Sequence, residues 1–438
     1  MKKITKYFIL YITYIYMLFY CFDKYLTDVY GYYGFENKMT IMSCVIGITL
    51  LTVAFIFVVK QTTDNYSKLV VYVLVLVNFI PSIITYIFMP ISEKYLLLQV
   101  LYWIIMILFI NYFNKFHFKA NKAKTKNSLI SMYVLILIEF IIVGIILFKY
   151  TGINLKFDNV YDLRNNYFNA RVPLVLAYLF AAFKVINPLL FIYLFNNKKR
   201  VAYMLSAMIQ LMAFCADGSK STLFSIIIAY GIVKFLYNKK DVDLFKSGNI
   251  KYYILSGLVA INFLGFIEFN FLKSANIYNY FVRRLFFVPA LLNQYYFDFF
   301  SNHEIDLFRQ SFMGKLGFES PYTDQIQKII SSVYFNTPEM LANNGLFSDA
   351  FMNLGSMGMF IMPMLICVLL RFLDYCAEGI NPFYLLTIMV NVSYIFMSSS
   401  FFTVLLTHGF ILLCLIMKFV IPRNEKERKC ERIVKKNI

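Results

Sequence analysis

The stretch that decides the fold is SLISMYVLILIEFIIVGIILF at residues 128–148, where a single glutamate is the one charged residue. A helix that crosses a membrane needs about 20 consecutive, mostly apolar residues, and this run has that length and composition. The segment before it carries five lysines between residues 115 and 127, and Lys149 follows it directly. Runs of the same kind recur along the chain, so the sequence predicts a polytopic membrane protein.

The composition agrees with this prediction. Hydrophobic residues make up 60% of the 438-residue chain and charged residues 15%, whereas an average globular chain has about 25% charged residues. One water-soluble core cannot bury so much apolar surface, which excludes an ordinary soluble enzyme, a disordered chain and a secreted disulfide scaffold. The seven cysteines form no CxxC pair, so no metal site and no disulfide framework is predicted.

Twelve apolar runs qualify as membrane spans. They cover residues 5–22, 40–59, 69–89, 95–113, 128–149, 172–195, 201–217, 221–237, 252–272, 352–373, 382–399 and 402–421. If the N-terminus lies inside and the spans alternate, every basic cluster falls on the inner side, as the positive-inside rule requires. The net charge of +18 is therefore interpreted as topogenic and not as a nucleic-acid surface. The expected topology is multi-pass, with cytoplasmic N- and C-termini.

One loop is much longer than the others and is expected to fold. Residues 273–351 form it on the outer side, and apolar residues recur at three- and four-residue spacing from Tyr278 to Phe299, which is typical of an amphipathic helix. A second helix is predicted near 322–335. The predicted organisation is spans 1–9 in 1–272, an extracytoplasmic helical cap in 273–351, spans 10–12 in 352–421, and a basic cytoplasmic tail in 422–438.

Cations on the predicted outer side are candidates for an anion site, because guanidinium groups bind phosphate through paired hydrogen bonds. The candidates are Arg171, Lys220 in the turn DGSKS, the adjacent Arg283 and Arg284, and Arg309. The alternative is that these side chains only snorkel to lipid headgroups. No phosphate-binding loop, dinucleotide fingerprint or zinc motif occurs, and no metal or cofactor is predicted.

Two kinds of acid–base candidate stand out. His303 and Glu304 follow the arginine helix in FDFFSNHE, with Asp298 and Asp306 nearby, and a histidine or carboxylate there suits a general base. The alternative is a solvated loop at a helix end. Inside the predicted spans, Glu139 and Lys184 are expected to form an ion pair, because an isolated charge at that depth is costly; a proton relay is the alternative.

Three stretches resemble the membrane polymerases that join O-antigen or capsular repeat units (the Wzy type). They are FCADGSKSTLFSIIIAYG at 214–231, YNYFVRRLFFVPALLNQYY at 278–296 and PEMLANNGLFSDAFMNLGSMGMF at 338–360. Many spans with one large outer loop late in the sequence also fit that family. The chain departs from the family at Lys220, where arginine is commoner, so the paired hydrogen-bond geometry is lost there.

The resemblance implies an all-α, GT-C-like glycosyltransferase that joins undecaprenyl-diphosphate-linked oligosaccharides at the outer face of the membrane. It implies a diphosphate held by Arg283 and Arg284, with Lys220, Arg171 and Arg309 as further candidates. His303 or Glu304 would activate the acceptor hydroxyl, and Tyr295, Asn343 and Asn344 would hold sugar. A chain-length regulator is a possible protein partner. The alternatives are a flippase for lipid-linked oligosaccharides, an O-antigen ligase and a secondary transporter.

Overall fold

The computed structural model describes residues 2–112, 128–152, 163, 166–167, 169–236, 249–380 and 382–421, and within these ranges all regular secondary structure is helical. The chain divides into two compact units, each built from separate segments. The first unit comprises residues 1–116, 243–371 and 396–401, and the second comprises 117–242, 372–395 and 402–438. We describe each unit by itself.

The first unit contains the N-terminal helices and the predicted outer loop. Its helical elements are α1 (Lys2–Cys21), η1 (Phe22–Leu26), α2 (Thr27–Tyr30), η2 (Gly31–Tyr33), α3 (Ile41–Lys60), α4 (Tyr66–Leu74), η3 (Val75–Phe79), α5 (Ile80–Phe88), α6 (Glu93–Tyr112), α13 (Asn249–Phe271), η7 (Tyr278–Phe287), α14 (Val288–Asn302), η8 (Gly314–Leu316), α15 (Ile326–Phe335) and most of α16 (Phe347–Ala377). The second unit holds α7 (Ser128–Ile145), η5 (Ile146–Thr151), α9 (Leu174–Asn196), α10 (Arg200–Asp217), α11 (Lys220–Leu236), most of α17 (Pro382–Ser398), η9 (Thr403–Thr407) and α18 (Phe410–Phe419).

Eight helical stretches in the described part of the chain are long and apolar enough to cross a membrane. They are Ile4–Tyr33, Ile41–Lys60, Tyr66–Phe88, Glu93–Tyr112, Ile130–Thr151, Leu174–Asn196, Asn249–Phe271 and Phe347–Ala377. The other four predicted spans coincide with α10, α11, α17 and η9–α18, which are helical but shorter or more polar. The all-helical, polytopic architecture is therefore confirmed, whereas the number twelve stays a prediction.

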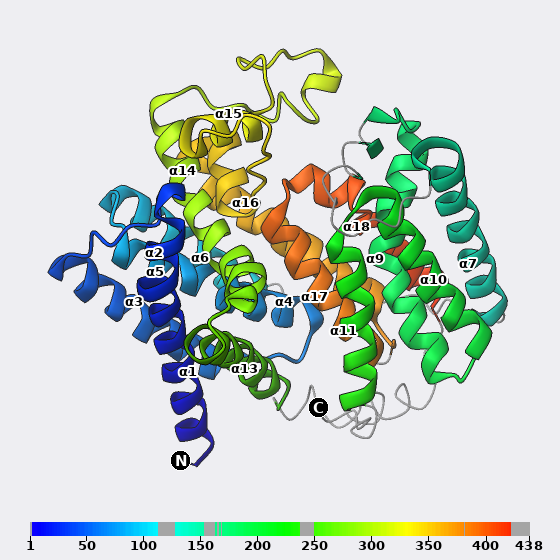
Figure 1. Ribbon diagram of the computed structural model, residues 1–438, viewed down its shortest axis with the longest axis horizontal. Coiled ribbons are helices and arrows are strands. Elements are labelled where there is room, and N and C mark those ends of the chain that lie inside the picture. Colours follow the sequence, from blue (N-terminus) through cyan, green and yellow to red (C-terminus); the bar gives the residue numbers. More distant parts are fainter. Residues whose placement is uncertain are drawn as a thin grey trace. The chain divides into compact units, whose positions relative to one another are not determined.

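The contacts of the first unit support the predicted alternation of spans. At one end the Lys251 ammonium donates to the carbonyl oxygens of Val58, Val59 and Gln61, at 3.1, 2.9 and 2.7 Å. The sequence places all four residues on the inner side or at the inner ends of the predicted spans. At the other end, Gln294 Nε2 donates to the Met89 carbonyl oxygen at 3.1 Å, which joins two segments assigned to the outer side. Figure 1 shows the N-terminus at the bottom of this unit and α15 at its top.

The amphipathic helix predicted in the outer loop is present and is packed against other helices of the first unit. It begins as the π-helix η7 and continues as α14, where ten of fifteen residues are buried. Asn293 Nδ2 lies 3.3 Å from Ser82 Oγ of α5, and the Phe286 ring packs edge-on against Tyr14 of α1. Apolar side chains on both faces of α14 explain this position. The second predicted helix is present as α15.

The predicted ion pair between Glu139 and Lys184 is wrong. The Lys184 ammonium pairs with the Asp217 carboxylate at the end of α10. Glu139 Oε2 instead accepts a 2.6 Å hydrogen bond from Asn187 Nδ2, and Ser206 Oγ donates to Asn187 Oδ1 at 2.8 Å. The long lysine side chain extends towards the helix end, while the shorter Asn187, one turn further along α9, takes the place facing Glu139.

This pairing predicts the effect of substitutions in the second unit. Lys184→Met leaves the partly buried Asp217 carboxylate without its cation, so we expect the free energy of unfolding to fall by about 3 kcal/mol. The double variant with Asp217→Asn should recover part of that loss, which a thermal denaturation series in detergent would measure. Glu139→Gln serves as a control outside the pair, and strictly additive losses in the double variant would contradict the pairing.

Candidate functional site

Five aromatic rings from three distant segments form an unbroken chain of ring contacts in the first unit, which we call the tyrosine shelf. Its members are Tyr30, Tyr33, Tyr295, Tyr334 and Phe335. Tyr30 stacks on Tyr33 with centroids 5.9 Å apart, Phe335 lies 5.3 Å from Tyr33 and 5.4 Å from Tyr295, and Tyr295 stacks on Tyr334 at 4.3 Å. The Tyr295 hydroxyl donates to the Tyr33 carbonyl oxygen at 2.9 Å. The shelf thus ties α2–η2, α14 and α15 together.

Arg283 lies at one end of the tyrosine shelf and is positioned by two neighbours. Its guanidinium carbon is 4.1 Å from the centroid of the Tyr30 ring. Its Nε and Nη2 donate to Asn279 Oδ1 at 3.0 and 2.8 Å, and the Tyr30 hydroxyl donates to the same oxygen at 2.9 Å. A guanidinium has five N–H donors, and among the described residues the other three have no partner. Arg283 is therefore held in place with donors left for an anion.

Arg284 follows Arg283 but lies in a different environment. It is exposed, and its guanidinium carbon is 5.8 Å from the centroid of the Tyr280 ring. Consecutive helical residues project in directions about 100° apart. The neighbours of Arg283 therefore do not position Arg284, and a joint grip of both residues on one diphosphate stays a prediction.

A carboxylate lies at the other end of the tyrosine shelf. The Tyr334 hydroxyl donates to Asp298 Oδ2 at 2.5 Å, and the Asp298 side chain is exposed. Burial, followed by the contact with Asp298, raises the pKa of Tyr334 above its ordinary value, and burial raises the pKa of Tyr295 to about 12. Both phenols therefore remain neutral hydrogen-bond donors at physiological pH. Asp298 offers the acceptor oxygens that sugar hydroxyls need.

His303 stands at the C-terminal end of α14 with one ring nitrogen engaged. The ring stacks on Phe299 at 4.0 Å, and Nδ1 lies 2.8 Å from the Phe299 carbonyl oxygen. Since a carbonyl only accepts, Nδ1 carries the hydrogen and Nε2 has the lone pair. The imidazole is exposed, and this tautomer suits it to accept a proton at Nε2.

Glu304 and Arg309 form an ion pair that closes the following loop. Arg309 Nη2 lies 2.7 Å from Glu304 Oε1 and 2.7 Å from the Ile305 carbonyl oxygen, and Nε lies 2.7 Å from the Asp306 carbonyl oxygen. Three local bonds thus occupy the arginine predicted to bind diphosphate, and the carboxylate predicted as a base faces a cation. Both side chains make contacts that hold the loop together. Diphosphate binding by Arg309 and base catalysis by Glu304 stay predictions.

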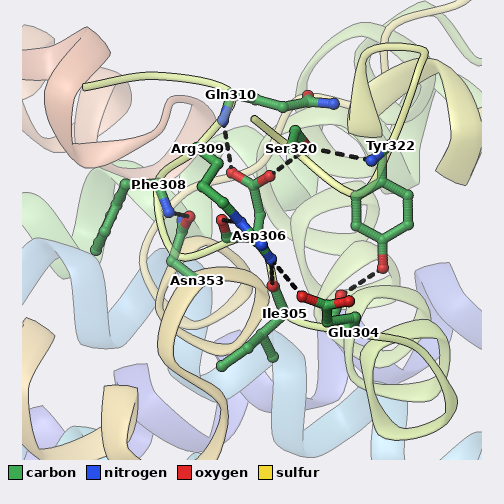
Figure 2. Close-up of polar contacts among 9 residues, drawn as sticks. All are labelled: Glu304, Ile305, Asp306, Phe308, Arg309, Gln310, Ser320, Tyr322 and Asn353. Carbon is green, nitrogen blue, oxygen red and sulfur yellow. Dashed lines mark hydrogen bonds and ion pairs between the residues drawn. The ribbon is translucent and has the colours of Figure 1, made fainter. Parts of the chain in front are cut away.

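The same loop is organised around the buried Asp306 (Figure 2). Its Oδ2 accepts from the Gln310 backbone N–H at 2.8 Å and its Oδ1 from Ser320 Oγ at 2.7 Å. Asn353 of α16 accepts from the Phe308 backbone N–H at 2.7 Å, and the Tyr322 hydroxyl donates to the Glu304 carbonyl oxygen. We call residues 304–322 the Asp306 loop. Its bonds fasten the chain immediately after His303 to α16.

The two predicted sugar-binding asparagines lie in different environments. Asn343 is exposed, whereas Asn344 is buried. Asn344 Nδ2 donates to the Pro289 carbonyl oxygen, Asn293 Oδ1 and Ser348 Oγ at 3.0, 3.0 and 2.8 Å. These bonds tie the segment before α16 to α14. Asn344 Oδ1 is buried and has no partner among the described residues, so its predicted contact with sugar stays a prediction.

Arg171 and Lys220 belong to the second unit and are not part of the tyrosine shelf. Arg171 is exposed with a positive φ of 47°, and Lys220 opens α11. In the turn before it, Gly218 adopts φ 64° and closes α10, and Asp217 Oδ1 accepts from the Ser219 backbone N–H at 2.9 Å. A carboxylate therefore occupies part of the turn that the sequence suggested for an anion.

Sequence reasoning missed Tyr30, Tyr33, Asn279 and Tyr334. The stretch VYGYYG at 29–34 lies in a predicted outer loop, and its density of tyrosines was a signal that went unused. Within the described residues no group of three His, Cys, Asp or Glu side chains is placed to hold a metal ion. No protein-family model, curated protein or solved structure matches the chain, so the functional argument rests on the residues themselves.

Asp306 provides a test of the loop. Asp306→Ala removes the acceptors for the Gln310 N–H and the Ser320 hydroxyl, so the loop should open more often and trypsin should cut faster after the exposed Lys315. Losing two such bonds costs on the order of 2 kcal/mol, which corresponds to roughly 30-fold faster cleavage. Asp324→Ala is the matched control, because that exposed side chain makes no bond within the loop. Equal cleavage rates for the two variants would contradict the assigned role.

Proposed function

We propose that this protein is a membrane glycosyltransferase that polymerises oligosaccharide repeat units carried on undecaprenyl diphosphate. The observation that carries the proposal is the placement of Arg283 and Asp298 at opposite ends of the tyrosine shelf. A cation with unused N–H donors suits a diphosphate, aromatic faces suit the C–H faces of sugar rings, and a carboxylate suits sugar hydroxyls. A site that binds free phosphate from solution would need the cation but not the aromatic rings of the tyrosine shelf.

The dimensions of the shelf also favour an extended ligand. Residues 283 and 295 are twelve positions apart on one continuous helix, whose π-helical part rises less per residue, so they are separated by somewhat less than the roughly 18 Å of a regular α-helix. Ring contacts run along this length without a break from Tyr30 to Tyr334. A diphosphate at Arg283 would therefore place the attached sugars along the tyrosines.

The distribution of basic residues favours an outer location for the shelf. Lys251 and Arg371 bond at the opposite end of the first unit, where Arg371 Nη1 lies 3.3 Å from Ser67 Oγ. Basic residues concentrate on the cytoplasmic side of membrane proteins. On this basis we infer that the shelf faces the outside of the inner membrane and the N-terminus faces the cytoplasm. Polymerisation of flipped lipid-linked units requires the site on that outer side.

The proposed reaction follows from the chemistry of these groups. Arg283 holds the diphosphate of the donor and stabilises the negative charge that develops as polyprenyl diphosphate leaves. A hydroxyl of the incoming unit attacks the anomeric carbon that is bonded to this diphosphate, and releases its proton. His303 lies twenty positions beyond Arg283 along η7 and α14, more than about 20 Å away, so it does not accept that proton while Arg283 holds the same donor. Asp298, with the Tyr334 phenol, orients sugar hydroxyls. The bond to diphosphate is already activated, so no nucleotide is consumed. A chain-length regulator remains a candidate partner.

The decisive test is elongation of a purified lipid-linked repeat unit by the purified protein, followed on a gel. Arg283→Gln should lower the rate by about 100-fold or more, the usual effect of losing one group that stabilises developing charge. Arg284→Gln is the matched control one residue away and should retain most activity. A wild-type protein that never elongates the unit, or an Arg283→Gln variant as active as wild type, would sink the proposal.

The assignment of the base has its own test in the same assay. His303→Gln keeps a polar side chain but removes the basic nitrogen. Because His303 lies twenty positions beyond Arg283 on one continuous helix, kcat should change little. Glu304→Gln should also change kcat little, because Glu304 Oε1 already pairs with Arg309. A fall in kcat of about 100-fold or more in either variant would identify that residue as the base and contradict this expectation. A flippase would show no elongation in any variant, and a ligase would require a different acceptor.

A further inference from the structure

An apolar groove with a basic rim runs between α7 and α10 in the second unit. It is an open groove of about 610 Å³, and its lining includes Tyr133, Ile136 and Leu137 of α7 and Val201, Ala202 and Leu205 of α10. Ile136 and Ala202 are buried and form the floor, while Tyr133, Leu137 and Val201 are exposed and form the walls. The groove lies near the start of α10 and within the first three turns of α7, which belongs to a candidate membrane helix.

Three consecutive cations, Lys198, Lys199 and Arg200, line the same groove. They occupy the tight turn between α9 and α10, where Lys198 adopts φ 58° and the Lys199 N–H donates to the Leu194 carbonyl oxygen at 3.0 Å. All three side chains are exposed. Within the described residues none of them pairs with a carboxylate, so their charge is uncompensated at the mouth of an apolar groove.

We propose that this groove binds an anionic glycerophospholipid such as phosphatidylglycerol. The lipid phosphate would contact Lys198, Lys199 and Arg200, and an acyl chain would lie over Ile136 and Ala202. Charge complementarity identifies the headgroup. Three cations attract an anionic headgroup much more strongly than a zwitterionic headgroup, which has no net charge. The apolar walls identify the tail, since a free phosphate would make no use of them. Basic pockets between membrane helices are typical sites of this class. The proposal is independent of the polymerase activity.

Native mass spectrometry of the full chain in detergent, titrated with phosphatidylglycerol or phosphatidylcholine, tests the headgroup. We expect phosphatidylglycerol to bind wild type roughly 10- to 100-fold more tightly, because each surface cation near an anionic headgroup contributes a several-fold gain. The triple variant K198Q/K199Q/R200Q should lose this preference. The control K273Q/K315Q/K328Q removes the same charge elsewhere and should retain it. Equal affinity of wild type for both lipids, or equal behaviour of the two triple variants, would overturn the proposal.

A second pair of variants tests the acyl-chain part. Leu137→Trp places a bulky ring in the groove from its exposed wall, and should weaken phosphatidylglycerol binding about tenfold while the melting temperature stays unchanged. Ile141→Trp makes the same change one turn further along the exposed face of α7, outside the groove lining, and should have no effect. If both tryptophan variants bind phosphatidylglycerol as wild type does, the lipid does not occupy the groove.

Discussion

The constraint that shapes this protein is the absence of water in the apolar phase, which obliges every backbone N–H and C=O group to find a partner within the chain. Helices satisfy that requirement inside each span, so the difficulty moves to the helix ends. The C-terminal carbonyls of α3 show one solution. The Lys251 ammonium donates to two of them and to the carbonyl of Gln61, which follows the helix, at 2.7–3.1 Å. These bonds satisfy orphan acceptors and place a cation at the negative end of the helix dipole.

A π-helical segment positions Arg283 at the end of the tyrosine shelf. η7 is a π-helix of ten residues, and π-helical segments widen the turn and are common at functional sites because they re-aim side chains. Arg283 lies inside this segment, one turn after Asn279, and both side chains meet Tyr30 from α2. The helix that carries the cation then becomes a regular α-helix at Val288, where its side chains enter the core of the first unit.

The sequence predicted the helical segments well and the side-chain partners poorly, for one physical reason. Length and hydropathy identify an apolar helix without reference to its neighbours, and each predicted apolar run is largely helical where the structure describes it. A partner depends on how a helix is rotated about its axis, so Lys184 and Glu139 could not be assigned to Asp217 and Asn187 from spacing alone. The shelf was missed because tyrosine and phenylalanine are frequent throughout the chain, and VYGYYG offered little contrast.

The candidate site combines a rigid part with a part held by a few polar bonds, and the division falls at His303. On its N-terminal side, α14 is packed against α5 and joined through Asn293 to Asn344 and Ser348, which fixes Tyr295 and Asp298. On its C-terminal side, the chain depends on Asp306 and Asn353 for its position. A polymerase must hold a donor firmly but release a product one unit longer. A separable loop next to a fixed helix would meet both requirements of the proposed polymerase, because the loop can open without moving the shelf or Arg283.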